Sequence, residues 1–119
     1  MGISELKDRF KRFAINVATL VNKLPFNQVN KVYSNQIIRS SSSSAANYRA
    51  ACRAKSQADF IYKLKIVEEE TDETIFFLEM IEAFNSNFKE ETTVLRKEGE
   101  ELLSITVKSI TTARKRKRG

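Results

Sequence analysis

The most informative stretch of this sequence is residues 56–84, SQADFIYKLKIVEEETDETIFFLEMIEAF. Apolar and threonine side chains recur in it at spacings of three and four, the period of one face of an α-helix. Ser56, followed three residues later by Asp59, resembles a capping box, so we expect Ser56 to be the N-cap. The predicted core-facing seam consists of Phe60, Leu64, Val67, Thr71, Thr74, Leu78 and Ile81. Further apolar residues widen this seam, which indicates that the helix contacts more than one neighbour.

Three more helices are predicted from similar patterns on either side of this stretch. The first covers residues 4–23, with Ser4 as its N-cap and with Pro25 ending it, because the residue before a proline is disfavoured in the α conformation. The second covers residues 28–54, and the fourth covers residues 88–112. A polar cluster of Asn and Ser just after residue 84 suits the turn that closes the third helix.

The second helix contains five consecutive serines, Ser40–Ser44, whose composition alone is typical of a flexible linker. The residues after them favour a helix instead, because alanine, the best helix former, occurs at five of the next eleven positions. No glycine or proline interrupts residues 26–98. We therefore predict an all-α protein, an up-down-up-down antiparallel four-helix bundle over residues 1–113, followed by a short disordered basic tail over residues 114–119.

Composition restricts the functions that this chain can have. Its 119 residues fit one domain, and its single cysteine permits no intramolecular disulfide. It contains no histidine, the commonest metal ligand and catalytic base, and no phosphate-binding loop. The acidic run 68–73 is expected to be a solvated face rather than a metal site. We expect no cofactor, no metal and no enzymatic activity.

Hydropathy indicates a cytoplasmic protein without a membrane partner. No apolar run approaches the roughly 20 residues of a membrane span. The first ten residues, MGISELKDRF, are charged too early for the apolar core of a signal peptide.

The formal net charge of +6 is unevenly distributed. Basic residues predominate in 1–65 and in 102–119, whereas acidic residues predominate in 66–101. Candidate nucleic-acid contacts are therefore the tail and the basic residues of the first two helices: Arg114, Lys115, Arg116, Lys117, Arg118, Arg9, Lys11, Arg12, Arg49, Arg53 and Lys55. Such residues would contact phosphates rather than bases. A solvated surface, or ion pairing with the acidic helices, is the alternative interpretation.

Other polar residues of the second helix are better explained by structure. Gln36, Arg39 and Asn47 lie in its middle, where a buried polar group must be hydrogen-bonded. We expect them to cap or cross-link helices, or to fix a subunit interface. Most aromatic residues belong to apolar stripes, so base stacking is poorly supported, with Tyr48 and Tyr62 as the possible exceptions.

The chain resembles the 23S rRNA intervening-sequence proteins, also called the four-helix-bundle protein family. The matching residues in the second helix and the start of the third are Gln36–Ser40, Ser43, Ala46–Ala51, Arg53, Ala54, Ser56, Asp59–Ile61, Lys63 and Leu64. The specific part is the segment from Gln36 to Tyr48. It extends over nearly the whole chain except the tail, and Phe77 stands where the family often has tryptophan.

The resemblance implies a four-helix bundle assembled as a homopentamer. Family members are often encoded within insertions in bacterial 23S rRNA genes, and relatives include accessory proteins of diversity-generating retroelements, which bind nucleic acid and a reverse transcriptase. Two functions are consistent with the sequence. One is a non-enzymatic oligomer that binds RNA or DNA. The alternative is a structural oligomer that binds a protein partner such as a reverse transcriptase.

Overall fold

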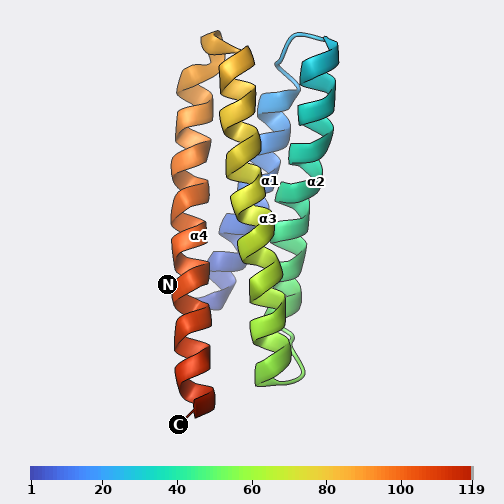
Figure 1. Ribbon diagram of the computed structural model, residues 1–119. Coiled ribbons are helices and arrows are strands. Elements are labelled where there is room, and N and C mark those ends of the chain that lie inside the picture. The colour runs from blue at the N-terminus through green and yellow to red at the C-terminus, as the bar shows by residue number, and fades with distance from the viewer. Residues whose placement is uncertain (119) are drawn as a thin grey trace.

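The computed structural model describes residues 1–118, which form four long helices and no strand. The elements in chain order are α1 Ile3–Val21, α2 Gln28–Ala51, α3 Gln57–Phe84, the 3-10 turn η1 Ser86–Phe88, and α4 Lys89–Arg118. Successive helices run in opposite directions along a body of 51 × 20 × 20 Å (Figure 1). The predicted all-α, up-down-up-down bundle is thus confirmed. None of the described helices is long and apolar enough to span a bilayer.

The start of α3 is capped as predicted. The Ser56 side chain accepts a hydrogen bond from the Asp59 backbone N–H at 3.0 Å. The Asp59 carboxylate in turn accepts from the backbone N–H of Lys55 at 3.2 Å, one residue earlier than in a standard capping box. Both ends of the motif satisfy backbone N–H groups that have no intrahelical partner.

The start of α1 differs from the prediction, which placed the N-cap at Ser4. Gly2 is the N-cap, in an extended conformation, and its carbonyl accepts the Leu6 N–H at 3.0 Å. Ser4 therefore lies inside the first turn. Glycine readily adopts the extended conformation of an N-cap and is accepted there without a side-chain hydrogen bond. The helix therefore begins two residues earlier than it would with Ser4 as the N-cap.

The ends of α2 and α4 also differ from the predicted ends. α2 ends at Ala51 rather than at residue 54, because the N–H groups of Arg53 and Ala54 turn back onto the carbonyls of residues 50 and 51. α4 does not end at residue 112 but continues to Arg118, so the residues expected to form a disordered tail extend the helix. Lysine and arginine are good helix formers, and their charges favour the negative end of the helix dipole. Gly119 lies outside the described residues.

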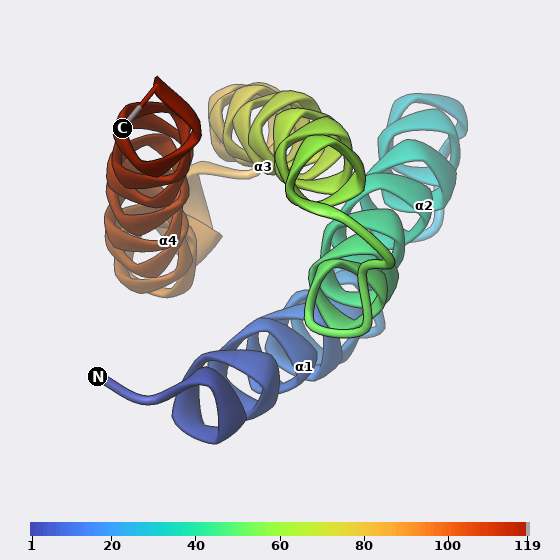
Figure 2. The same ribbon diagram turned by 90° about the horizontal axis from the view of Figure 1, so that it is seen from below.

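The core lies along one stripe of each helix. Six of the seven predicted seam residues of α3 are buried, and Phe60 at its start is half-buried. Figure 2, seen along the bundle, shows the helices as an arc in the order α4, α3, α2, α1. Packing is most extensive between α2 and α3 and between α3 and α4, and it is sparsest between α1 and α4. The bundle is therefore open along its α1–α4 side.

The serine run belongs to α2 and faces the core. Ser40, Ser41 and Ser44 are fully buried, and the hydroxyls of Ser40 and Thr74 are hydrogen-bonded at 2.8 Å. Because these side chains are small, the backbones of α2 and α3 can approach closely. The prediction of one continuous helix through the serines is confirmed, although it ends three residues early.

The two connections at one end of the bundle are joined by a buried pair of amides. Asn30 and Asn85 donate to each other's side-chain oxygens at 2.9 and 2.8 Å. Asn30 also donates to the Pro25 carbonyl, and Asn85 to the Ile81 carbonyl. This reciprocal pair fixes the α1–α2 loop against the α3–η1 turn.

Candidate nucleic-acid interface

The alternation of helix directions brings the basic segments of the sequence toward one end of the bundle. The first turns of α1, the last turns of α2 and the last turns of α4 all lie toward the end where α2 connects to α3 (Figure 1). We call this end the basic end. Its predicted contact residues on α2 and in the following loop, Arg49, Arg53 and Lys55, are exposed.

The last turns of α4 place the predicted tail residues at the same end. Arg114, Lys115 and Arg116 are exposed on consecutive helical positions, just after the buried Ala113. The Ala113 carbonyl accepts a hydrogen bond from the Gln57 side chain of α3 at 3.0 Å, which holds this part of α4 to the bundle. The side chains of Lys117 and Arg118, two further predicted contacts, lie outside the described residues.

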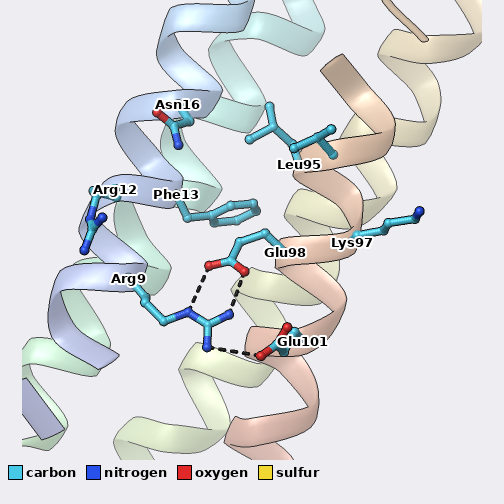
Figure 3. A pocket seen from close by; sticks show the side chains of 9 residues that line it. Arg9, Arg12, Phe13, Asn16, Leu95, Lys97, Glu98 and Glu101 are labelled. Carbon is cyan, nitrogen blue, oxygen red and sulfur yellow. Dashed lines mark hydrogen bonds and ion pairs between the residues drawn. The ribbon is translucent and has the colours of Figure 1, made fainter. Parts of the chain in front are cut away.

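A hollow of about 570 Å³ lies between α1 and α4, and an ion-pair cluster closes one end of it (Figure 3). The Arg9 guanidinium donates to both carboxylate oxygens of Glu98, at 3.0 and 2.6 Å, and to Glu101 at 3.2 Å. These bonds raise the pKa of Arg9 above its ordinary value. Arg12 is paired with Asp8, one turn earlier on α1. Both predicted contacts are thus partly neutralised by carboxylates.

The opposite edge of α1 is different. Lys7 and Lys11, one turn apart, border a hollow of about 470 Å³ between α1 and α2, together with Arg49. Both lysines are exposed. Lys11 and Arg49 were predicted contacts, but Lys7 was missed, although its spacing of four from Lys11 was a signal that the two share one face.

The three polar residues in the middle of α2 have separate roles. Arg39 bridges to α3, donating to Glu70 at 2.9 Å and to Glu73, and these bonds raise its pKa. Gln36 only accepts a long bond from Arg39 at 3.4 Å. Asn47 donates to the Ser43 carbonyl within its own helix at 2.9 Å. The predicted cross-linking is seen at Arg39 alone.

The two tyrosines considered for base stacking also differ. Tyr48 is buried and stacked on Phe10, with ring centroids 4.8 Å apart, so it belongs to the core. Burial raises the pKa of Tyr48 to about 12. Tyr62 is 62% exposed near the start of α3, with the Lys63 ammonium 5.7 Å from its ring centroid. Tyr62 is therefore the tyrosine that a base could reach at the basic end.

Two kinds of reactive site come into question in the described part of the chain: clusters of metal ligands and a nucleophilic thiol. No group of three or more acidic or sulfur-bearing side chains among those residues could hold a metal ion. Cys52 is half-buried, and desolvation raises the pKa of its thiol, which disfavours the nucleophilic thiolate.

An aromatic face extends across α2 and α3. Tyr33 lies 6.2 Å from Phe84 and 6.1 Å from Phe77, and Phe77 lies 5.6 Å from Phe76, measured between ring centroids. Phe76 is 51% exposed and Phe84 is 57% exposed. Such a contiguous exposed apolar patch is typical of an interaction surface.

A second hollow, of about 590 Å³, adjoins the first along the α1–α4 side. The two share Asn16, Val94 and Leu95 in their linings, so they form one groove. Val94 is 67% exposed in it, and Glu90 and Glu91 border its far end.

Comparison with known proteins agrees with this architecture. A family model described as 23S rRNA-intervening sequence protein matches residues 5–108. The chain is also similar to a crystal structure of a protein of unknown function from the S23 ribosomal protein family of Bacteroides thetaiotaomicron. The two are 32% identical with a TM-score of 0.78, and the alignment covers 88% of this chain and 97% of that one. No curated protein matches the chain.

Proposed function

We propose a function from the premise that this chain belongs to the 23S rRNA-intervening sequence protein family: it is a non-enzymatic, oligomeric bundle that binds nucleic acid through its basic end. The observation that supports this is the convergence of three basic segments, distant in sequence, at one end of the molecule (Figure 1).

The proposed contacts are cations that no carboxylate neutralises. Within the part of the chain whose side chains are described, Arg49, Arg53 and Lys55 form no ion pair, nor does the basic stretch 114–116. Each phosphate that such a cation neutralises releases a counterion condensed on the nucleic acid, and this release favours binding at low salt. Contacts of this kind position a nucleic acid without selecting its sequence.

A gel-shift titration with a structured RNA at two salt concentrations tests the proposal. We compare the wild type with a variant carrying Arg114→Gln, Lys115→Gln and Arg116→Gln. A matched control carries Lys31→Gln, Lys89→Gln and Lys97→Gln, which removes the same charge from exposed positions elsewhere. The tail variant should lower the slope of log K against log salt by roughly 2–3, as expected for three lost phosphate contacts. Equal effects of both variants, or no salt-sensitive binding by the wild type, would refute it.

Oligomerisation is proposed through the aromatic face of α2 and α3. Half-exposed Phe76 and Phe84 would be covered by a second copy, because burying an aromatic side chain is strongly favourable. Light scattering should show an oligomer for the wild type and a smaller species for Phe76→Ser with Phe84→Ser. Val107→Ser, at a 41% exposed position of α4, is the control. A wild-type monomer at micromolar concentration would contradict this part of the proposal.

A protein partner is the second candidate function, and the α1–α4 groove favours it. The groove has an apolar floor that includes Leu20 and Leu95, and an acidic border at Glu90 and Glu91. Affinity capture with Val94→Glu as the blocked variant separates the two functions. Loss of a captured protein with RNA binding unchanged would assign the groove to a protein and the basic end to RNA.

A further inference from the structure

We propose that the hollow between α1 and α2 is a discrete binding site for one phosphate group, held by Lys7, Lys11 and Arg49. Its role in nucleic-acid recognition rests on the function proposed above. The site itself is inferred from the shape, the lining and the unpaired charge of this hollow, which has a volume of about 470 Å³.

The cations approach the hollow from two helices. Lys7 and Lys11 are four residues apart and therefore lie on one face of α1, along the edge next to α2. Arg49 faces them from the last turn of α2. The Ser4 hydroxyl, one turn before the lysines, adds a further donor to the lining. Cations on two sides of one space can converge on a single anion.

Alanines provide the space. Ala45 and Ala46 form the α2 side of the hollow next to Arg49. A leucine or a long polar side chain at either position would occupy the volume that a phosphate needs. Ala46 is exposed, so nothing in the packing of the bundle requires it to be small. Its small size leaves the space above it free for a ligand.

The charges in the hollow are not neutralised by the protein. Its lining contains one carboxylate, Asp8, and Asp8 is already paired with Arg12. In the part of the chain with described side chains, Lys7, Lys11 and Arg49 form no ion pair. This distinguishes the hollow from the α1–α4 side, where Arg9 is bound by two glutamates.

The chemistry of the three side chains fits a phosphate. An arginine guanidinium can donate two parallel hydrogen bonds to two phosphate oxygens. Two lysine ammonium groups then act as point charges that neutralise the remaining negative charge. The phosphate could be an internal phosphodiester of a nucleic-acid backbone or a terminal 5′-phosphate, because both present the two non-bridging oxygens that an arginine can bind.

The first test measures phosphate binding without any RNA. Inorganic phosphate is titrated into the full-length protein at constant ionic strength, and backbone amide NMR shifts are followed. Saturable shifts should be confined to the neighbourhoods of Lys7, Lys11 and Ala46, and they should be lost in Arg49→Gln. Shifts that do not saturate, or that spread equally over the other lysines, would overturn the proposal.

The second test uses a variant that fills the hollow without changing its charge. Ala46→Leu should abolish saturable phosphate binding and weaken binding of a short RNA by about tenfold, the loss expected for one charge-assisted contact. Ala83→Leu, at an exposed position of α3, is the matched control and should bind as the wild type does. Unfolding curves for both variants verify that they fold.

The outcomes separate this site from the general function. If RNA binds and Ala46→Leu changes neither RNA binding nor phosphate binding, the proposed RNA contact at the basic end is retained and the discrete phosphate site is refuted. If phosphate binds in an Arg49-dependent way and no RNA binds, the site is retained and the nucleic-acid function is refuted. Tighter binding of a 5′-phosphate RNA than of its 5′-hydroxyl form would identify a terminal phosphate, and equal binding would identify an internal phosphodiester.

Discussion

Gly99 is the position in α4 where the packing of neighbouring helices requires the smallest residue. A Cβ atom added there would lie 3.1 Å from Ile75 Cγ1 and 3.1 Å from Phe13 Cζ. Phe13 is fully buried and cannot move aside without disturbing the core. The close approach of α1, α3 and α4 at this point explains why a glycine is tolerated inside a helix.

Gly99→Ala should therefore lower stability, despite the better helix propensity of alanine. Alanine gains about 1 kcal/mol of propensity, whereas overpacking costs about 1–3 kcal/mol. We expect a net loss of about 1 kcal/mol in the free energy of unfolding, measured by urea denaturation. Ser104→Ala, at an exposed position of the same helix, should be neutral or slightly stabilising. A stabilised Gly99→Ala protein would show that the three helices can separate without cost.

Glu82 gives the fold a dependence on pH. Its carboxylate accepts a hydrogen bond from the buried Thr92 hydroxyl at 2.8 Å and lies 3.4 Å from Arg96 Nη1. The Thr92 bond is the main cause that lowers the pKa of Glu82 below its ordinary value of 4.5. Because the folded pKa is lower than the unfolded one, the carboxylate stabilises the fold above pH 4.5, and this contribution is lost as the pH falls through the folded pKa.

The difference in unfolding free energy between the wild type and Glu82→Gln should show this dependence on pH. Urea denaturation at pH 7, 5 and 3.5 should show the largest difference at pH 7 and the smallest at pH 3.5. Glu79→Gln, at an exposed position one turn earlier, provides the baseline. A difference that is constant over this pH range would mean that the Thr92 bond does not distinguish the two protonation states of Glu82.

α2 depends on its small side chains where it faces α3. Ser44 is fully buried, and its hydroxyl donates to the Ser41 carbonyl at 2.9 Å. Ser42, two residues earlier, is exposed. The same residue type therefore has opposite environments within half a turn, and this difference gives a matched pair of substitutions.

Ser44→Leu should destabilise the bundle by about 1–3 kcal/mol or more, because the additional volume forces α2 away from the core. Ser42→Leu should change stability by less than about 0.5 kcal/mol. Thermal or urea denaturation of the two variants provides the comparison. Equal effects would indicate that the position of a serine on the helix, buried or exposed, does not determine how well a larger side chain is tolerated.

The open α1–α4 side leaves α1 with few contacts to α4, although it packs against α2. Arg9, with its bonds to Glu98 and Glu101, supplies the ion pairs between these two helices among the described residues. A lysine cannot reproduce the fork of bonds that the guanidinium makes. The attachment of the first half of α1 to α4 should thus depend on Arg9.

Arg9→Lys should increase amide hydrogen exchange in the first turns of α1 while leaving α3 protected. The expected cost is about 1 kcal/mol, the usual upper range for partly exposed ion pairs. Arg12→Lys affects only an exposed pair within α1 and is the control. Unchanged exchange in Arg9→Lys would show that apolar contacts alone hold the helix.

The prediction from sequence was most reliable where a signal is local. The α3 seam and the Ser56 cap were predicted correctly, because burial repeats every three to four residues and a cap involves only adjacent residues. Helix ends were less predictable. α4 continued beyond residue 112 because nothing in the basic stretch breaks a helix, and α1 started at Ile3 because Gly2 took the place expected for Ser4.

The candidate site was only partly predictable for a different reason. The sequence determined which residues are basic, which helices contain them and, through alternating directions, that they gather at one end. The tertiary structure decided which of these charges are neutralised: Arg9 faces glutamates of α4, whereas Lys7 and Lys11 border a hollow with no unpaired carboxylate. Pairing depends on the rotation of each helix against its neighbours, and that rotation is set by the packing of all four apolar stripes together rather than by any one of them.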